Sequence, residues 1–238
     1  MTYITAHSGC EGTPAGSMES ITRALELGAD FIEVDVRRSP EGILYLSHDV
    51  ADPAGLLTLD DAFAAIQGTP LRINCDLKEQ STLYPVLDLA RLYGYGPEKV
   101  TISGCTSPEQ LARDLSINEH VSVALNIEEI LKFLYLLENP LFTIPLMRNP
   151  WELVSSMELT GPRINNMIGL IQNTGAHSLN LPYRLLSEPL IILCKIANIP
   201  LSVWTVNDPI IVQQCLDAGV ENITTTQVTQ ALKLRDDL

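Results

Sequence analysis

Acidic side chains near the ends of two strand-like segments are the residues best suited to chemistry. Glu33 and Asp35 lie in FIEVDVRRS, and Asp76 lies in LRINCDLK. Side chains alternate across a strand, so residues two positions apart point the same way. Alternation therefore puts Arg37 on the face of Glu33 and Asp35, and it puts Lys78 on the face of Asp76.

Three carboxylates in a low-dielectric mouth repel one another or take up protons unless a cation lies among them. Oxygen ligands without histidine or cysteine suit a hard divalent cation such as Mg²⁺ or Ca²⁺. We therefore predict that Glu33, Asp35 and Asp76 bind a divalent metal ion. From spacing alone, the alternative is that these side chains face solvent or pair with lysine and arginine.

Two histidines follow strand-like segments near these acids. His7 ends the first segment, and His48 follows a short run that comes after the second. Imidazole titrates near neutral pH, so such a pair can divide the roles of general base and general acid. A lone histidine is more often a packing or surface residue. His120 and His177 precede their strands, and we assign them no role.

Short apolar strand-like runs alternate with helical patterns along the chain, which is typical of βα units and a parallel sheet. Eight such units in 238 residues have the size of an α/β (β/α)8 TIM barrel, whose active sites lie at the carboxyl ends of the strands. The expected strands are residues 3–7, 31–36, 71–77, 100–103, 121–125, 178–181, 201–206 and 222–225.

Two segments are additional to the strands and helices of a minimal barrel. Residues 43–48 are expected to form a short hairpin at the barrel rim rather than a ninth wall strand. Residues 126–176 are about twice what one helix and its loops require. We predict a small helical excursion over about 127–175, between strands 5 and 6, that roofs the pocket or forms an oligomer contact. Its expected helices are residues 127–137, 151–159 and 163–171.

Composition restricts the partners of the chain. The 15 Lys and Arg against 29 Asp and Glu give a net charge of −14, which argues against nucleic acid and against stable association with an anionic membrane. No secretory leader or membrane-spanning run is apparent, and five cysteines without CxxC spacing favour reduced thiols. We expect one cytoplasmic domain over 1–238, with a homo-oligomer left open. An anionic substrate would need a local reversal of the negative charge.

The segment from His7 to Asp49 resembles the opening of the glycerophosphodiester phosphodiesterase family. That family shows a histidine at the end of its first strand, then Glu-x-Asp-Val, an Asp-Gly turn and a His-Asp pair, and INCDLK, SVWTVND and AGVENITTT resemble its later elements. The resemblance implies a TIM-type barrel in which a metal ion and two histidines cleave phosphodiesters. The matching positions are Glu33, Asp35 and Asp76 for the metal, His7 and His48 for acid–base catalysis, Lys78 for phosphate binding and Trp204 for the pocket wall.

The chain also departs from the family pattern. Ser8 stands where the family has an arginine, so a charge-assisted phosphate clamp is lost. Ala15 stands where it has a glutamate, Asp76 is one methylene shorter than the family's glutamate, and for Trp204 core packing is the alternative role. Arg37 is the candidate for the missing clamp, and a solvent-facing rim arginine is the alternative.

The sequence predicts a metal-dependent phosphodiesterase that hydrolyses glycerophosphodiesters to an alcohol and glycerol 3-phosphate. One alternative is the same chemistry on a different phosphodiester, such as a bulkier lysophospholipid. A second is a noncatalytic barrel that binds phosphate or metal. Which histidine is the acid, and whether cleavage is direct or passes through a cyclic phosphate, are not assigned.

Overall fold

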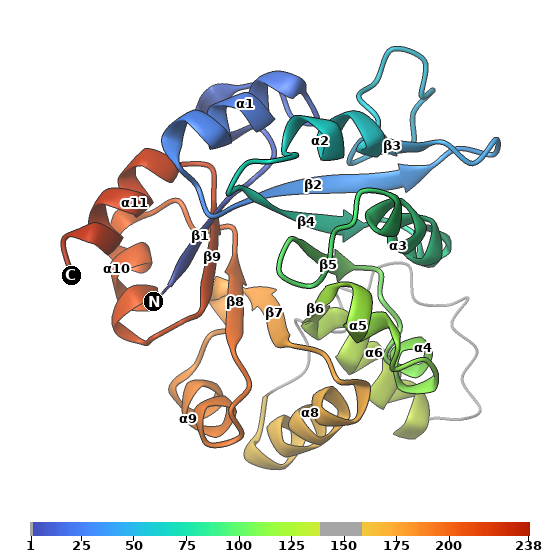
Figure 1. The fold of residues 1–238 in the computed structure, drawn as a ribbon. Helices are drawn as coiled ribbons and strands as arrows, with labels where there is room; N and C mark the ends of the chain where they lie inside the picture. Colours follow the sequence, from blue (N-terminus) through green and yellow to red (C-terminus); the bar gives the residue numbers. More distant parts are fainter. Residues whose placement is uncertain (1, 139–158) are drawn as a thin grey trace.

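The barrel closes by pairing its first strand with its last. The computed structural model describes residues 2–138 and 159–238, in which eight parallel strands form a ring (Figure 1). The predicted TIM barrel is confirmed, because β1 pairs with both β2 and β9. The barrel strands are β1 (Tyr3–Ala6), β2 (Phe31–Arg38), β4 (Arg72–Leu77), β5 (Val100–Gly104), β6 (Ser122–Asn126), β7 (Ser178–Pro182), β8 (Leu201–Trp204) and β9 (Asn222–Thr225).

The expected rim hairpin is present. The short strand β3 (Leu44–Leu46) pairs antiparallel with the end of β2 and lies outside the ring (Figure 1). This pairing explains why β2 runs to Arg38, beyond the expected end at residue 36. Conversely, β8 ends at Trp204, before the expected end at residue 206.

Helices surround the ring and cover its outer face (Figure 1). Polar side chains begin several of them: Ser17 Oγ accepts from the Ser20 amide, and Thr58 and Asp61 form a reciprocal capping box. The helices described are α1 (Met18–Leu27), α2 (Leu59–Ala65), α3 (Leu83–Leu92), α4 (Pro108–Arg113), α5 (Ile117–His120), α6 (Ile127–Glu138), α8 (Gly161–Thr174), α9 (Glu188–Ile196), α10 (Pro209–Asp217) and α11 (Val228–Asp236).

Two of the three helices expected in the excursion are confirmed as α6 and α8. The third, over 151–159, lies outside the described residues except for its last position. In the described part of the chain, no helix combines the length and the apolar character needed to cross a membrane.

The hydrophobic core lies between the strands and the helices. Ile32 and Val34 of β2, like Ile73 and Cys75 of β4, are buried there. Their alternation leaves polar side chains of the same strands pointing into the barrel. Apolar packing between the strands and the surrounding helices therefore stabilises the fold, and the inner face of the strands is available for a site.

Candidate active site

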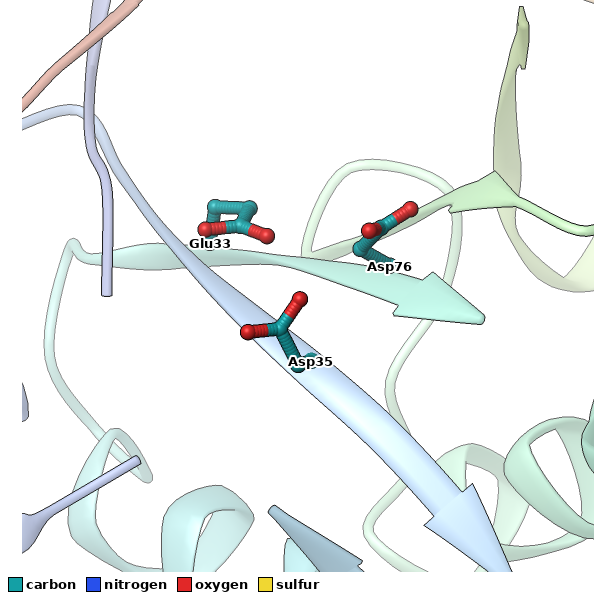
Figure 2. A group of neighbouring side chains, drawn as sticks. All are labelled: Glu33, Asp35 and Asp76. Atoms are coloured by element: carbon teal, nitrogen blue, oxygen red, sulfur yellow. The ribbon is translucent and has the colours of Figure 1, made fainter. Parts of the chain in front are cut away.

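The register of two neighbouring strands brings the acidic residues together. Asp35 on β2 lies directly opposite Asp76 on β4, and Glu33 is two residues earlier on β2. One carboxylate oxygen of each residue lies within 4.8 Å of the others, and Figure 2 shows the three carboxylates gathered in one region. We call Glu33, Asp35 and Asp76 the acidic cluster. Alternation along two neighbouring strands placed these carboxylates together, and Lys78 also pairs with Asp35 and Asp76.

The acidic cluster is held in a buried, electrostatically crowded position. Burial and the charges of Asp35 and Asp76 together raise the pKa of Glu33 to about 7, although His7 and the Ser8 amide act in the opposite direction. Crowded carboxylates that are short of compensating charge favour a bound cation. The cluster therefore has both the donor type and the electrostatic demand of a site for a hard divalent metal.

Gly104 permits the close approach of the neighbouring strand to Asp76. Its φ is +79°, in the left-handed region, and a Cβ there would collide with Asp76 Oδ1 and with the Leu77 backbone. Ser103, the preceding residue, donates a hydrogen bond from its hydroxyl to Asp76 Oδ1 at 3.3 Å. The end of β5 thus fixes the orientation of the Asp76 carboxylate.

Lys78 supplies positive charge directly to the acidic cluster. Its Nζ lies 2.6 Å from Asp35 Oδ1 and 2.5 Å from Asp76 Oδ2. Burial lowers the pKa of this amine, but Asp76 and Asp35 outweigh that effect, and the net shift is upward. Lys78 is therefore a fixed cation at the position that the family resemblance implies for phosphate binding.

The two histidines differ in their surroundings. His7 Nδ1 donates to the Ser8 carbonyl at 2.9 Å, so in the neutral ring Nε2 carries the lone pair, 3.9 Å from Glu33 Oε2. His48 is largely exposed, and its Nδ1 lies 3.0 Å from Asp49 Oδ1. In both rings Nε2 is left to exchange a proton with a ligand.

A cavity of about 370 Å³ unites most of the expected site residues. It lies at the carboxyl ends of the strands, where the acidic cluster and Lys78 form part of its wall. His7, His48 and Trp204 also line it. The structure does not bring Arg37 into this wall.

Arg37 instead fastens the loop that carries His48. Its Nε and Nη2 donate to the His48 carbonyl oxygen at 3.0 and 2.8 Å, and Nη1 lies 2.9 Å from Glu79 Oε1. These contacts engage three of its five N–H groups away from the acidic cluster. Arg37 thus contacts the rim loop and Glu79, and in the structure it does not line the cavity.

On the expected acid–base role of His48, replacing Arg37 with methionine should lower kcat by about tenfold, because a displacement of the imidazole by about 1 Å would remove much of its rate advantage. We expect divalent metal affinity to be unchanged, since Arg37 does not contact the acidic cluster. Steady-state kinetics and metal titration calorimetry measure the two quantities. Arg38→Met is the control, because Arg38 is the exposed neighbour. Equal kcat values for the two variants would contradict the positioning role.

Ser8, which departs from the family pattern, contacts Gly16, the residue after Ala15. The Gly16 amide donates to Ser8 Oγ at 2.7 Å, and the Ser8 amide donates to Glu33 Oε2 at 3.2 Å. A Cβ at Gly16 would lie 3.0 Å from the Leu46 carbonyl oxygen. Ser8 and Gly16 are therefore hydrogen-bonded to each other beside Glu33, in the region where the family has an arginine.

Sequence reasoning missed several polar residues of the cavity wall, four of which carry a side-chain amide or carboxyl group. Asn126 Oδ1 accepts from the Gly104 amide at 3.2 Å and from Asn180 Nδ2 at 2.8 Å. Glu128 and Glu129, in the first turn of α6, also line the cavity. Their positions in the sequence could have indicated them, because all four lie at or just after the carboxyl end of an expected strand.

The fold and the site define a TIM barrel with an oxygen-rich, potential metal site at its carboxyl-end mouth. The model of the glycerophosphoryl diester phosphodiesterase family matches residues 7–65 of the chain. That match includes Glu33 and Asp35 together with both histidines of the cavity. The family resemblance seen in the sequence is thus confirmed.

Solved structures match the chain over nearly its whole length. A glycerophosphodiester phosphodiesterase from Parabacteroides distasonis is 20% identical with a TM-score of 0.70, covering 99% of this chain and 97% of that one. The enzyme from Thermotoga maritima is 19% identical, with a TM-score of 0.68 and 99% of each chain covered. A phosphodiesterase from Oleispira antarctica, solved with the product sn-glycerol-3-phosphate, is 14% identical, with a TM-score of 0.70 and coverage of 99% and 97%. At these identities the matches show a shared fold. No curated protein sequence matches the chain.

Proposed function

We propose that this protein is a metal-dependent phosphodiesterase that hydrolyses glycerophosphodiesters to an alcohol and glycerol 3-phosphate. The observation that carries the proposal is the convergence of the acidic cluster, Lys78 and two histidines on one cavity. A barrel that only bound phosphate would have no need of two imidazoles with available Nε2 atoms beside a metal site.

The acidic cluster fits a divalent metal ion by its donor chemistry. It offers oxygen atoms alone, within 4.8 Å of one another, and its burial and the mutual repulsion of its carboxylates raise the pKa of Glu33. Such ligands favour Mg²⁺ or Ca²⁺ over softer metals. When bound, a divalent cation would polarise a phosphoryl oxygen and offset transition-state charge.

The chain's own residues supply the remaining chemistry. Lys78 is a protonated amine at the cavity wall, and it can bind a nonbridging phosphate oxygen and stabilise charge that develops there. One histidine takes the proton of the attacking hydroxyl, which belongs to water or to the glycerol of the substrate. The other donates a proton to the leaving alcohol. Trp204 lines the cavity and is proposed to contact the organic part of the substrate.

This function is tested by release of free alcohol from a series of glycerophosphodiesters and lysophospholipids in the presence of Mg²⁺ or Ca²⁺. We expect turnover of at least one glycerophosphodiester that depends on the metal and is abolished by a chelator. Higher kcat/KM for lysophospholipids would redirect the substrate assignment. A folded, metal-binding protein that turns over none of these diesters would refute the proposal and favour the binding barrel.

A further inference from the structure

A second cavity lies at the opposite end of the barrel from the candidate active site. It measures about 330 Å³ and is lined by residues near the amino ends of the strands; we call it the amino-end cavity. Bulky aliphatic side chains usually fill the interior of a (β/α)8 barrel. Here a hollow interior forfeits packing contacts that a bound ligand would restore. The inward-facing residues of this end are small or polar instead, and they include Thr5, Thr101, Ser122, Ala124, Ser178 and Ser202.

Part of the wall of the amino-end cavity is a chain of hydrogen bonds with one direction. Thr5 Oγ1 donates to Asn222 Oδ1 at 2.6 Å, and Asn222 Nδ2 donates to Ser202 Oγ at 3.0 Å. All three residues line the cavity, and Thr5 and Ser202 are only 1% and 6% exposed. Because Ser202 acts as an acceptor in this chain, its own hydroxyl hydrogen remains to be donated. The wall is therefore suited to binding a hydroxyl group of a ligand.

Arg72 supplies a positive charge that two aromatic rings hold at the same wall. Its guanidinium carbon lies 4.1 Å from the centroid of the Tyr3 ring and 4.0 Å from that of the Phe31 ring. The two rings meet edge to face, with 71° between their planes, and they also line the cavity. Contacts with ring faces fix a guanidinium without using its N–H groups as hydrogen-bond donors. Arg72 can thus offer two parallel donors to a carboxylate.

The other charged residues of the wall favour a ligand with a single negative charge. His177 Nε2 lies 2.8 Å from Glu221 Oε2, and this hydrogen bond raises the pKa of His177. Glu98 is exposed, whereas Arg72 is partly buried. A ligand with two negative charges would be repelled by both glutamates. One carboxylate paired with Arg72 therefore matches this wall better than a phosphate group does.

We propose that the amino-end cavity is a binding site for a small carboxylic acid that carries hydroxyl groups, such as a sugar acid. The carboxylate accepts N–H donors of Arg72, and a hydroxyl group of the ligand accepts from Ser202. The site is separate from the proposed phosphodiesterase chemistry, because among the described residues Asn74 is the one that lines both cavities. The inference therefore goes beyond the proposed function and does not depend on it.

Calorimetry with gluconate and glucitol tests the carboxylate, because the two molecules share a polyhydroxy chain and differ in one terminal group. EDTA is present throughout, so that a metal ion at the acidic cluster does not contribute. We expect gluconate to bind the wild-type protein about tenfold more tightly than glucitol. Glucitol 6-phosphate carries a second negative charge and should bind more weakly than gluconate. Gluconate that binds no more tightly than glucitol, or less tightly than the phosphate, would overturn the inference.

Variants place the bound acid in the amino-end cavity. Arg72→Met keeps an unbranched side chain against the two rings and removes the guanidinium, so it should weaken gluconate binding about tenfold. Arg91→Met is the matched control, because it removes an exposed arginine of α3 that does not line the cavity, and it should keep the wild-type affinity. Unchanged affinity in Arg72→Met would refute the site. Should that variant fail to fold, Ser202→Ala decides, since it removes the proposed hydroxyl donor, and unchanged gluconate affinity there would refute the site equally.

Discussion

Asp35→Asn is expected to abolish tight binding of the divalent metal ion and to lower kcat/KM by about a thousandfold. Asp35 faces Asp76 across the β2–β4 register, and both carboxylates contact the same lysine, Lys78. An amide has one acceptor oxygen and no charge, so the electrostatic attraction for the metal ion weakens and one potential ligand oxygen is lost. A thousandfold corresponds to about 4 kcal/mol of transition-state stabilisation.

Titration calorimetry with Mg²⁺ and Ca²⁺ measures the loss of binding, and steady-state kinetics measures the loss of activity. Asp88→Asn removes one negative charge from an exposed position on α3 and is the control for net charge. Circular dichroism establishes that both variants are folded. If Asp35→Asn bound metal as tightly as the Asp88 variant did, the acidic cluster would not be the metal site.

Replacing either cavity histidine with asparagine should lower kcat by about a hundredfold to ten-thousandfold, the range typical of general acid–base catalysis. Asparagine preserves a polar side chain of similar reach but does not titrate near neutral pH. Metal affinity should change little, because neither imidazole belongs to the acidic cluster. His7→Asn and His48→Asn are therefore expected to separate activity from metal binding.

The leaving group distinguishes the two histidines. A diester with a p-nitrophenyl leaving group needs no protonation, so the variant that lacks the general acid should regain most of its activity on this substrate. The variant that lacks the base should not. His120→Asn is the control, because His120 ends α5 before β6, at the opposite end of the barrel. Loss of less than tenfold in both cavity variants would exclude acid–base roles for the pair.

Strand periodicity carried the prediction of the fold and of the acidic cluster because both depend on backbone geometry. All eight wall strands formed at the expected segments, and alternation placed Asp35 and Asp76 on facing strands. The same rule did not place the guanidinium of Arg37. Alternation fixes where a Cβ points, whereas a long side chain at a strand end turns toward the nearest strong acceptor. For Arg37 that acceptor is a loop carbonyl, which no periodicity encodes.

Contacts between distant segments were also beyond the sequence pattern. The hydrogen bond between Ser8 and Gly16 and the one between Asn126 and Asn180 depend on how loops and strands meet after the barrel closes. Glu128 was missed for a different reason, because a glutamate in a first helical turn is ordinarily a solvated cap. Its burial depends on the packing of α6 against the barrel mouth, which is a tertiary property.

Barrel closure has a consequence for when the site matures during synthesis. His7 follows β1, and its amide donates to the carbonyl of Thr225 at 2.9 Å, just as the Glu11 amide donates to the Thr226 carbonyl at 2.8 Å. Contacts between residues so far apart in the chain form late, because their loop-closure entropy must be overcome first. The backbone contact that holds His7 against the last strand can therefore form only after β9 has been synthesised. A nascent chain that has already made its acidic strands still lacks a complete active site until β9 has emerged.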